Sequence, residues 1–472
     1  MTIGIECHVQ LATATKLFSP ADNDARGKSP NSVVHPIDFG LPGMLPVLNR
    51  EAVNLAIKAG KALNAKIANV SRFDRKHYFY PDLPKGYQTT QMYQPIILEG
   101  FVDAPLEDGG SAHVRIHHAH MEEDAGKLTH NGDHSLVDLN RAGTPLIEIV
   151  SEPDIHSAAE AKAFATELYR LMTYAGVTHG NLYHGNMRFD VNVSVAPKGA
   201  TELGKRAEVK NLNSFRSVEK AAEYEFKRQV ALLEKGERVV QETRGWDDAK
   251  MITNSQRSKE DAQDYRYMPD ADIPPIVLSD QEISEIQATV PTLPSAYREK
   301  WASLSLDRSV VDSLLATQAF AGLISSIQDQ AGDDTAKRVA HWFASALGHQ
   351  DEEQASAEVK DLSPRSFIEL SEMVAKNELS STAAKEVFLE LLSSDKSAHI
   401  IAESKNLIQV SDESAIAAIV DEVLADPASA KAIEDIKNGN EKVIGFLVGQ
   451  VMKKSAGKAN PALAQKLIRE RL

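Results

Sequence analysis

The sequence predicts an α+β fold, with a strand-rich first part followed by a helical second part. Before about residue 290, Gly, Pro, His and aromatic residues are frequent, and short β-like runs alternate with turns. After that point Ala, Leu, Ser, Glu and Lys dominate, and apolar residues recur at helical spacing. Residues 290–300 contain two prolines and are the expected linker between the two parts.

Length and composition indicate a folded protein of several domains. The chain has 472 residues, and at roughly 150 residues per domain about three domains are expected. Its 42% of hydrophobic and 25% of charged residues exclude a largely disordered chain. No apolar run approaches the roughly 20 residues that span a bilayer, and MTIGIECHVQ has no basic start typical of a signal peptide. The single cysteine excludes a disulfide framework and a zinc site built on several thiolates, which favours a reducing, cytoplasmic setting.

The charge of the chain is unevenly distributed. A net charge of -15 excludes a general nucleic-acid coat, because phosphate binding needs clustered Lys and Arg. The segment from residue 441 to the end is nevertheless basic, with only Glu441 and Glu470 as acidic residues. Its basic residues are Lys442, Lys453, Lys454, Lys458, Lys466, Arg469 and Arg471.

Several helices of the second part have clear start signals. The Ser-Pro pair at 363–364 and the Asn-Pro pair at 460–461 each predict an N-cap followed by Pro at the first helical position. Another helix is expected from about Ser381. Gly445 and Gly449 lie four residues apart in an apolar stretch, and we expect a partner helix to approach them closely.

Four short runs in the first part alternate strictly between apolar and polar residues, so each is expected to be a half-buried strand. In the first run, Glu6, His8 and Gln10 face away from the apolar residues. In the second, alternation puts Val114, Ile116, His118, His120 and Glu122 on one face and Glu123 on the other. In the third, Arg188, Asp190, Asn192 and Ser194 form the polar face, and in the fourth Arg206, Glu208 and Lys210 share a face. The runs are IGIECHVQL, AHVRIHHAHMEED, MRFDVNVSV and KRAEVKNLN.

Each polar face taken alone is most simply a solvated side of an antiparallel sheet. Taken together, as neighbouring strands, the four runs predict a cluster of carboxylates, which repel one another unless a cation lies between them. Oxygen ligands with a single imidazole suit Mg²⁺ or Mn²⁺ better than zinc. The residues expected to converge are Glu6, His8, Asp190, Glu208 and one or both of Glu122 and Glu123.

Basic residues near this cluster would hold phosphate, and they are Arg188, Lys210 and Lys127. A carboxylate-bound metal beside cations is typical of sites for phosphoryl transfer. The pattern does not identify the phosphate donor or the acceptor. The chain has no Walker A loop, GxGxxG fingerprint or HExxH motif.

Other reactive residue types are expected to be mainly structural. His113, His117, His118 and His120 resemble a metal cluster, but their spacing is loose and alternation sends them to opposite faces; His120 is the one expected to approach the site. Cys7 lies on the apolar face of its strand, which favours a small buried hydrophobe over a nucleophile.

Residues 73–91 mix cations with aromatic residues, and two interpretations stay open. Tyrosines interleaved with cations can stack on bases or clamp an acylated end of an RNA. Alternatively, this is a loop that packs its tyrosines on the core. The residues concerned are Arg75, Lys76, Lys85, Tyr78, Tyr80 and Tyr87, and residues 264–275 have the same ambiguity.

Eight runs of the first part together resemble the B subunit of the tRNA-dependent amidotransferase (GatB), and the resemblance covers nearly the whole chain. The runs are IGIECHVQL, FDRKHYFYPDLPKGYQ, HMEEDAGK, SLVDLNRAGTPLIEIVSEPD, NMRFDVNVS, VKNLNSFRSVEKAAEYE, QETRGW and DYRYMPD. The C-terminal run GFLVGQVMKKSAGKANPALAQKLI resembles the tail domain that the family shares with YqeY-like proteins.

The resemblance implies a fold and a reaction. The fold would be a cradle domain with a mainly antiparallel sheet, related to glutamine synthetase and guanidino kinases (1–290), then an all-α helical domain (291–395) and a YqeY-like tRNA-binding tail (396–472). The reaction would be ATP-dependent phosphorylation of the side-chain carboxylate of misacylated aspartyl-tRNA(Asn) or glutamyl-tRNA(Gln), followed by amidation with ammonia from glutamine. An amidase A subunit would release that ammonia, and a small C subunit would complete a heterotrimer.

The resemblance also implies roles for individual residues. Metal-binding positions of the family correspond to Glu6, His8, Glu122, Glu123, Asp190 and Glu208. Family positions for substrate or channel correspond to Lys76, Lys127, Arg141 and Lys210. Taken from the residues themselves, Tyr80, Lys85 and Arg188 are further candidates for binding ATP, substrate or tRNA, and Lys453, Lys454 and Lys458 are expected to project from a turn between two helices to contact tRNA.

The sequence departs from the family pattern in two respects and leaves two alternatives. Residues 12–43 lack the two cysteine pairs that bind structural zinc in some members, so no zinc is expected. The chain begins only five residues before Glu6, so either the first strand is short or the native start lies upstream. The alternatives are a self-contained ligase that amidates a free amino acid, against which the basic tail argues, and a non-catalytic scaffold, against which the carboxylate cluster argues. Whether aspartyl-tRNA, glutamyl-tRNA or both are substrates stays open.

Overall fold

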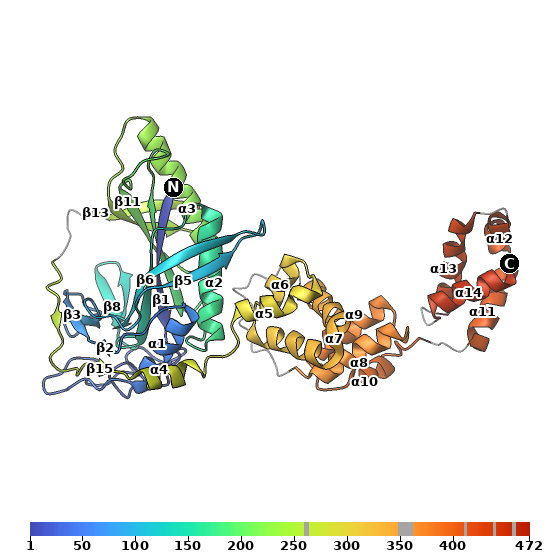
Figure 1. Cartoon of the computed structure of the whole chain (residues 1–472), viewed down its shortest axis with the longest axis horizontal. Helices are drawn as coiled ribbons and strands as arrows, with labels where there is room; N and C mark the ends of the chain where they lie inside the picture. The colour runs from blue at the N-terminus through green and yellow to red at the C-terminus, as the bar shows by residue number, and fades with distance from the viewer. Residues whose placement is uncertain (259–263, 348–361, 410–412, 438–439, 456–458) are drawn as a thin grey trace. The chain divides into compact units, whose positions relative to one another are not determined.

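The computed structural model describes residues 1–258, 264–347, 362–409, 413–437, 440–455 and 459–472. Backbone contacts divide the chain into two compact units, Met1–Ala296 and Tyr297–Leu472. The first unit contains all the named strands and the second is helical, which confirms the predicted α+β class (Figure 1).

One large sheet organises the first unit. All neighbouring strands are antiparallel except β11 and β12, which are parallel. In sheet order the strands are β13 (Ile252–Ser258), β12 (Glu242–Asp247), β11 (Arg206–Leu212), β10 (Met187–Ser194), β1 (Thr2–Gln10), β9 (Pro145–Ser151), β6 (Ser111–Glu123) and β5 (Gly100–Pro105). The first strand is therefore a full strand of nine residues.

Three helices cover the apolar face of this sheet and form the core with it. They are α1 (Arg50–Ala62), α2 (Ala158–Tyr174) and α3 (Phe215–Glu234), and Figure 1 shows α2 and α3 beside the strands. Each begins where the side chain of an N-cap residue accepts a backbone N–H: Asn49, Ser157 and Ser214. With this face covered, the opposite, polar face is left for chemistry.

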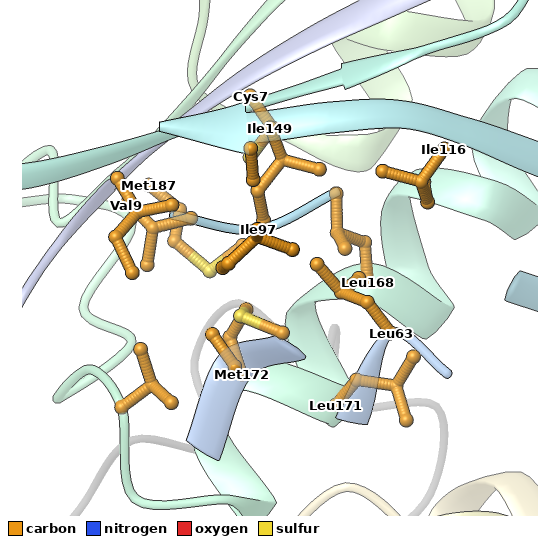
Figure 2. Packing of buried hydrophobic residues seen from close by; sticks show 14 of the residues in the cluster. Cys7, Val9, Leu63, Ile97, Ile116, Ile149, Leu168, Leu171, Met172 and Met187 are labelled. Atoms are coloured by element: carbon orange, nitrogen blue, oxygen red, sulfur yellow. The ribbon is translucent and has the colours of Figure 1, made fainter. Parts of the chain in front are cut away.

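The lone cysteine belongs to the core, as predicted. Cys7 is fully buried on the apolar face of β1, and Figure 2 shows it near Ile149 of β9 within the packed cluster. Burial raises the pKa of its thiol well above the usual value. A protonated, buried thiol is not a nucleophile.

Small strands and short helices complete the first unit. Hairpin β7 (Lys127–Asn131) and β8 (His134–Asp138) stands alone, and β2 (Val70–Ser71) pairs with β15 (Ile276–Val277). A three-stranded sheet contains β14 (Met268–Pro269), β3 (Asp74–His77) and β4 (Tyr87–Thr90). Helix α4 (Asp280–Gln287) packs on α1, and α5 (Pro294–Lys300) spans the division between the units.

The second unit is built from helices whose starts match the predicted signals. Ser363 precedes Pro364 at the start of α8, α9 begins at Ser381, and the Asn460 side chain accepts the N–H of Ala462 (3.0 Å) at the start of α14. The helices are α6 (Arg308–Leu314), α7 (Gln318–Leu347), α8 (Pro364–Ala375), α9 (Ser381–Leu391), α10 (Ala398–Ser404), α11 (Glu413–Ala425), α12 (Ala430–Lys437), α13 (Ile444–Lys454) and α14 (Pro461–Arg471), with 3₁₀ turns η2 (Trp301–Leu304), η4 (Pro427–Ser429) and η5 (Glu441–Val443).

Two features of the second unit differ from simple expectation. Helix α7 is broken at Gly332, whose φ of 79° lies in the left-handed region that favours glycine. The expected close approach of a helix to Gly445 and Gly449 is wrong for the described residues, because a Cβ built on either glycine meets no atom within 4 Å. The core side of α13 is instead formed by Leu447 and Val451, which pack with α11 and α14.

No single described helix is long and apolar enough to cross a membrane. The bent pair of α6 and the described part of α7, with 113° between them, passes that test only by length and composition.

A buried ion pair ties together two loops beside the sheet. The Lys16 ammonium lies 3.1 Å from Asp38 Oδ2, and both side chains are almost fully buried. Asp38 also accepts the backbone N–H of His35, and the Leu17 N–H donates to the Gly143 carbonyl oxygen. Burial lowers the pKa of Lys16, and the Asp38 carboxylate opposes this effect. The pair therefore holds residues 16–38 against the turn at Gly143.

Replacing Lys16 with Met should destabilise the first unit by about 3 kcal/mol, because it leaves the Asp38 carboxylate buried without its partner. The control is Lys28→Met, since that ammonium lies 3.9 Å from Asp22 and both side chains are half exposed; a change within about 0.5 kcal/mol is expected. Hydrogen exchange of the β1 amides in increasing urea gives the free energy of unfolding. Equal small effects of both substitutions would contradict a structural role for the buried pair.

A candidate metal and phosphate site on the sheet

The antiparallel register brings acidic residues of five strands onto one open face of the sheet. Glu6 of β1 is directly opposite Asp190 of β10, and His8 is opposite Glu148 of β9. Glu148 in turn is opposite His120 of β6. Because side chains alternate along a strand, these residues all project from the face opposite the core. The structure places Glu6, His8, Asp190, Glu208 and Glu122 on this face, although not in one single cluster.

The structure sorts these residues into two groups. In the first, which we call the His8 group, the ligand atoms of His8, Glu122 and Glu148 lie within 4.8 Å of one another. His8 Nε2 is 3.6 Å from both Glu122 Oε1 and Glu148 Oε2. A second imidazole is close, with His120 Nε2 at 3.3 Å from Glu148 Oε2 and 3.7 Å from Glu122 Oε2.

The ionisation of this group follows from burial and pairing. Burial lowers the pKa of His120, but hydrogen bonds to Glu122 and Glu148 outweigh it and raise that pKa to about 10. Burial raises the pKa of Glu148, but the hydrogen bond from His120 and the charge of the imidazoles outweigh it, so the net pKa falls well below its usual value. The Glu148 carboxylate is thus available as a ligand.

The second group, which we call the Glu6 group, has only carboxylates. Ligand oxygens of Glu6, Asp190 and Glu208 lie within 4.8 Å of one another. The Lys210 ammonium contacts two of them, at 3.0 Å from Asp190 Oδ2 and 2.9 Å from Glu208 Oε1.

Negative charge in the Glu6 group is not fully offset. Burial raises the pKa of Glu6, and the carboxylates of Glu148 and Glu208 raise it further. The pKa of Lys210 is also raised, because Asp190 and Glu208 outweigh the lowering by burial. For Glu6, burial is the larger cause of the raised pKa, and the smaller contribution of the neighbouring carboxylates is one that an added cation would offset.

The donor chemistry of both groups fits a hard divalent cation. One imidazole with two carboxylates, or three carboxylates, suits Mg²⁺ or Mn²⁺. No thiolate is available, because Cys7 is buried on the other face. Both groups could therefore hold such a cation.

A cavity of about 530 Å³ adjoins the Glu6 group on the same face. Gly4, Glu6 and Asn192 line it from β1 and β10. Lys205 and Arg206 supply positive charge at its edge. A cavity of this size with convergent polar groups is typical of a small-molecule site.

Comparison with known proteins shows the family of this chain. Residues 1–284 match the family model described as the GatB/GatE catalytic domain, and residues 323–472 match the model described as the GatB domain. The chain belongs to the GatB family. It is similar to the B subunit of the aspartyl/glutamyl-tRNA(Asn/Gln) amidotransferase of Carboxydothermus hydrogenoformans (43% identical over 100% of this chain and 98% of that protein) and of Alkalilimnicola ehrlichii (47%, 100% and 98%). It is also 44% identical, over 100% of its length, to 87% of the B subunit of the chloroplastic/mitochondrial glutamyl-tRNA(Gln) amidotransferase of Oryza sativa.

Of the adjacent GatB residues Glu122 and Glu123, only Glu122 joins a group. Glu123 lies on the other face of β6, where it accepts from the Lys85 ammonium and from the Thr89 N–H (2.9 Å). This placement does not support the predicted metal role of Glu123. Alternation alone separates the two residues, and the Lys85 contact shows what the second carboxylate does instead.

The prediction that strict alternation holds along the whole of β6 is wrong. Val114 and Ile116 are buried with the core, whereas His118, His120 and Glu122 lie on the polar face. A bulge between Ile116 and His118 inserts one extra residue relative to β9, which reverses the parity of the strand.

The histidines of β6 form a line toward the His8 group. His117 Nδ1 lies 2.7 Å from His118 Nδ1, and His118 Nε2 lies 3.2 Å from His120 Nδ1. Burial and the neighbouring His120 lower the pKa of His118 to about 4. His120 is the histidine that reaches the site, as predicted, whereas His113 pairs with Asp103 at the exposed end of the strand.

The predicted cations lie at different places around the two groups. Burial lowers the pKa of Lys76, but nearby anions, with Glu122 first, outweigh it and raise the pKa. Arg188 is directly opposite His8 in the sheet, and its guanidinium donates to Asp124 (3.0 Å). Arg141 donates to the carbonyl oxygens of residues 125 and 126 and lies 3.3 Å from the same aspartate.

Of the tyrosines of residues 73–91, Tyr78 fits the interpretation of packing within the protein, and Tyr80 fits that of stacking on a ligand. Tyr78 is packed between the rings of Tyr80 (6.4 Å) and Tyr265 (6.1 Å), and burial raises its pKa. Tyr80 is 53% exposed and free to stack on a ligand. Lys127, at the start of β7, is exposed.

Two of the predicted tail lysines lie within a helix. Lys453 and Lys454 are exposed in the last turn of α13 rather than in a turn between helices, and the Lys454 ammonium is 3.3 Å from Glu422. Lys458 lies outside the described residues.

Sequence reasoning missed Glu148. Its strand reads LIEIV, in which four of the five residues are apolar, so no polar face is indicated there. The available signal was a single carboxylate among four apolar residues, since burying it without a partner is costly. Only the register with His8 and His120 reveals the partner.

The placement of the adjacent glutamates leads to a direct test. Glu122→Gln should lower the affinity of the full-length protein for Mn²⁺ at least about tenfold, as expected for loss of a metal-site carboxylate. Glu123→Gln should leave it near the wild-type value, because Glu123 is on the other face. Mn²⁺ titrations by electron paramagnetic resonance compare the two. Equal losses would contradict the assignment of the His8 group.

Proposed function

We propose that the chain is the B subunit of a tRNA-dependent amidotransferase, an ATP-dependent ligase that acts on aspartyl-tRNA(Asn), glutamyl-tRNA(Gln) or both. The observation that carries the proposal is the pair of oxygen-rich groups, one of them in contact with Lys210, on the sheet of a chain that matches GatB over its whole length. The product would be asparaginyl-tRNA(Asn) or glutaminyl-tRNA(Gln).

The chemistry explains why such a site is needed. A carboxylate is a poor acceptor for ammonia, whereas an acyl phosphate is a good one. In the first step a side-chain oxygen of the aminoacyl group bonds to the γ-phosphorus of ATP and ADP leaves. In the second, ammonia bonds to the acyl carbon, phosphate leaves and one proton is released. The protein must therefore hold two anionic substrates close together.

This chain's own residues would divide that task. Mg²⁺ or Mn²⁺ held by the His8 and Glu6 groups would neutralise charge on the transferring phosphoryl oxygens. Lys76 and Arg188 would orient the anionic acceptor through charge-assisted hydrogen bonds. The cavity beside Glu6, with Lys205 and Arg206 at its edge, would receive the nucleotide. Exposed Tyr80 would stack on the terminal base of the acylated RNA.

Further parts of the proposal come from the family resemblance. The first unit would have the fold of a glutamine synthetase-like and guanidino kinase-like cradle, and the last helices that of a YqeY-like tail. An amidase A subunit would release ammonia from glutamine and a small C subunit would complete the heterotrimer. The chain carries no cysteine pairs for structural zinc, so none is expected.

ATP hydrolysis by the reconstituted heterotrimer tests the function. It should require both Mg²⁺ and misacylated tRNA, and Asp190→Asn should reduce it about 100-fold, because the site loses a carboxylate that would hold the cation offsetting the negative charge of the transition state. Lys220→Met is the control, since Lys220 pairs with Glu223 on α3, away from the polar face. Steady-state ATPase assays with charged and uncharged tRNA give the answer. A scaffold without chemistry predicts no tRNA-dependent hydrolysis.

The basic tail should bind tRNA without taking part in chemistry. Residues of α11, α13 and α14 form a hydrophobic cluster of their own, and the exposed Lys453 and Lys454 lie on its surface. Replacing both with Ala should raise the KM for misacylated tRNA and leave kcat unchanged. Each lost phosphate contact should reduce the salt slope by about 0.7 to 0.9.

Lys431→Ala is the matched control for the tail, because this exposed lysine lies on α12 outside the basic segment. Transamidation is measured against tRNA concentration at two salt concentrations. An unchanged KM with a reduced kcat would place the lysines in the catalytic fold instead.

A further inference from the structure

We infer that Lys210 is an exchangeable internal cation: its ammonium occupies the Glu6 group when no metal is bound, and it moves to a phosphate oxygen when metal and nucleotide bind. The inference rests on the proposed function and concerns one residue of the same site. It makes Lys210 a switch between two sets of anions rather than a fixed structural lysine.

The first argument is where the ammonium lies. Its contacts at 3.0 Å with Asp190 and 2.9 Å with Glu208 go to two carboxylates of the three that form the group. The ligand oxygens of that group are all within 4.8 Å of one another, so a divalent cation held by them would lie beside the ammonium. Two cations that close together repel strongly in a partly buried site. Metal binding and the present position of Lys210 are therefore in competition.

The second argument is that the carboxylates have other contacts which do not depend on Lys210. The Asn192 amide donates to Glu6 Oε1 (3.0 Å), and the Thr243 hydroxyl donates to Glu208 Oε2 (3.0 Å). These donors are neutral, so they position the oxygens without competing electrostatically with a metal. If the ammonium leaves, these two hydrogen bonds still hold the carboxylates of Glu6 and Glu208 in position.

The third argument is mobility. The Lys210 side chain is 37% exposed, whereas those of Asp190 and Glu208 are 6% and 12% exposed. A lysine has a flexible stem of four methylenes and a compact charge that readily changes partner. Glu6 also lines the adjoining cavity, so phosphates entering from the cavity would come within the region that the stem can sweep.

The His8 group provides an internal comparison. There the compensating groups are the imidazoles of His8 and His120, which are fixed on strands opposite Glu148. An imidazole can become a ligand itself, whereas an ammonium has no lone pair and cannot. The Glu6 group differs because its compensating cation is the ammonium of a flexible lysine, which cannot become a ligand and must withdraw before a metal binds.

The mechanism has a thermodynamic consequence. When metal binds alone, it must displace Lys210 from the carboxylates, so the net free energy of binding is small. When nucleotide is also bound, the displaced ammonium has a phosphate oxygen as its new partner. Metal and nucleotide therefore bind cooperatively, and loss of the ammonium should change the two affinities in opposite directions. A lysine that only stabilises the fold would change both in the same direction.

Lys210→Met, which keeps the stem and removes the charge, tests this in the full-length protein. Isothermal titration with MnCl₂ in the absence of nucleotide should show affinity about tenfold tighter than wild type at one class of sites. At saturating Mn²⁺, the affinity for a non-hydrolysable ATP analogue should fall by about the same factor. Lys220→Met should change neither affinity.

A second variant assigns the effect to the Glu6 group. Adding Glu208→Gln to Lys210→Met should abolish the gain in Mn²⁺ affinity; a persistent gain would mean that the tightened site lies elsewhere and would overturn the inference. Unchanged or weaker Mn²⁺ binding by Lys210→Met, with normal wild-type binding, would overturn it as well while leaving the proposed function intact. If the wild-type protein bound no Mn²⁺ with or without nucleotide, the metal role itself would fail and the inference with it.

Discussion

Repulsion among carboxylates on one face of a sheet is the constraint on which the rest of this structure depends. On this one face, Glu6, Asp190 and Glu208 form one group, and Glu122 and Glu148 belong to a second group. Such a face is stable only if cations, imidazoles or a metal offset the charge. His8, His120 and Lys210 lie where they offset this charge, and the pKa of Glu6 is raised by burial first and by the nearby carboxylates second.

The fold meets this constraint by separating two tasks between the two faces of the same strands. One face of β1 and β10 packs against capped helices and carries the apolar core, including Cys7. The other carries the polar groups. Each candidate ligand residue of these two strands is flanked along its strand by residues packed in the core, so the core holds the backbone of the site in place. A site built on central strands is held more precisely than one built on loops. Pairs such as Lys16–Asp38 hold the surrounding loops without contributing to the groups themselves.

Membership in the GatB family gives this geometry a chemical purpose. Activation of a carboxylate by phosphoryl transfer requires that two anions approach, and an acidic face with two candidate cation sites could assemble both. The two groups differ in kind, because one is completed by imidazoles that can act as ligands and the other by an ammonium that cannot. That difference suggests unequal roles for the two groups. The tail residues form a separate cluster, which is consistent with tRNA recognition apart from chemistry.

The sequence by itself determined the class of fold, the alternation of β1 and β10, and most of the acidic residues. Period-two patterning is a local property, so Glu6, His8 and Asp190 could be assigned to a polar face without knowing their neighbours. The helix starts at Pro364, Ser381 and Pro461 were equally local, because caps depend on a few adjacent residues.

Tertiary structure alone decided what depends on pairing between distant segments. The bulge after Ile116 reverses the parity of β6, and nothing in the sequence of that strand marks it. Glu148 was hidden in an apolar run until the register placed it between His8 and His120, and only the fold showed that Glu123 contacts Lys85 on the other face. The division into two groups, with Lys210 bound to one of them, is likewise a matter of strand order and register. The physical reason is the same in each case: alternation fixes which face a side chain takes, but only the hydrogen-bonded register fixes what stands opposite it.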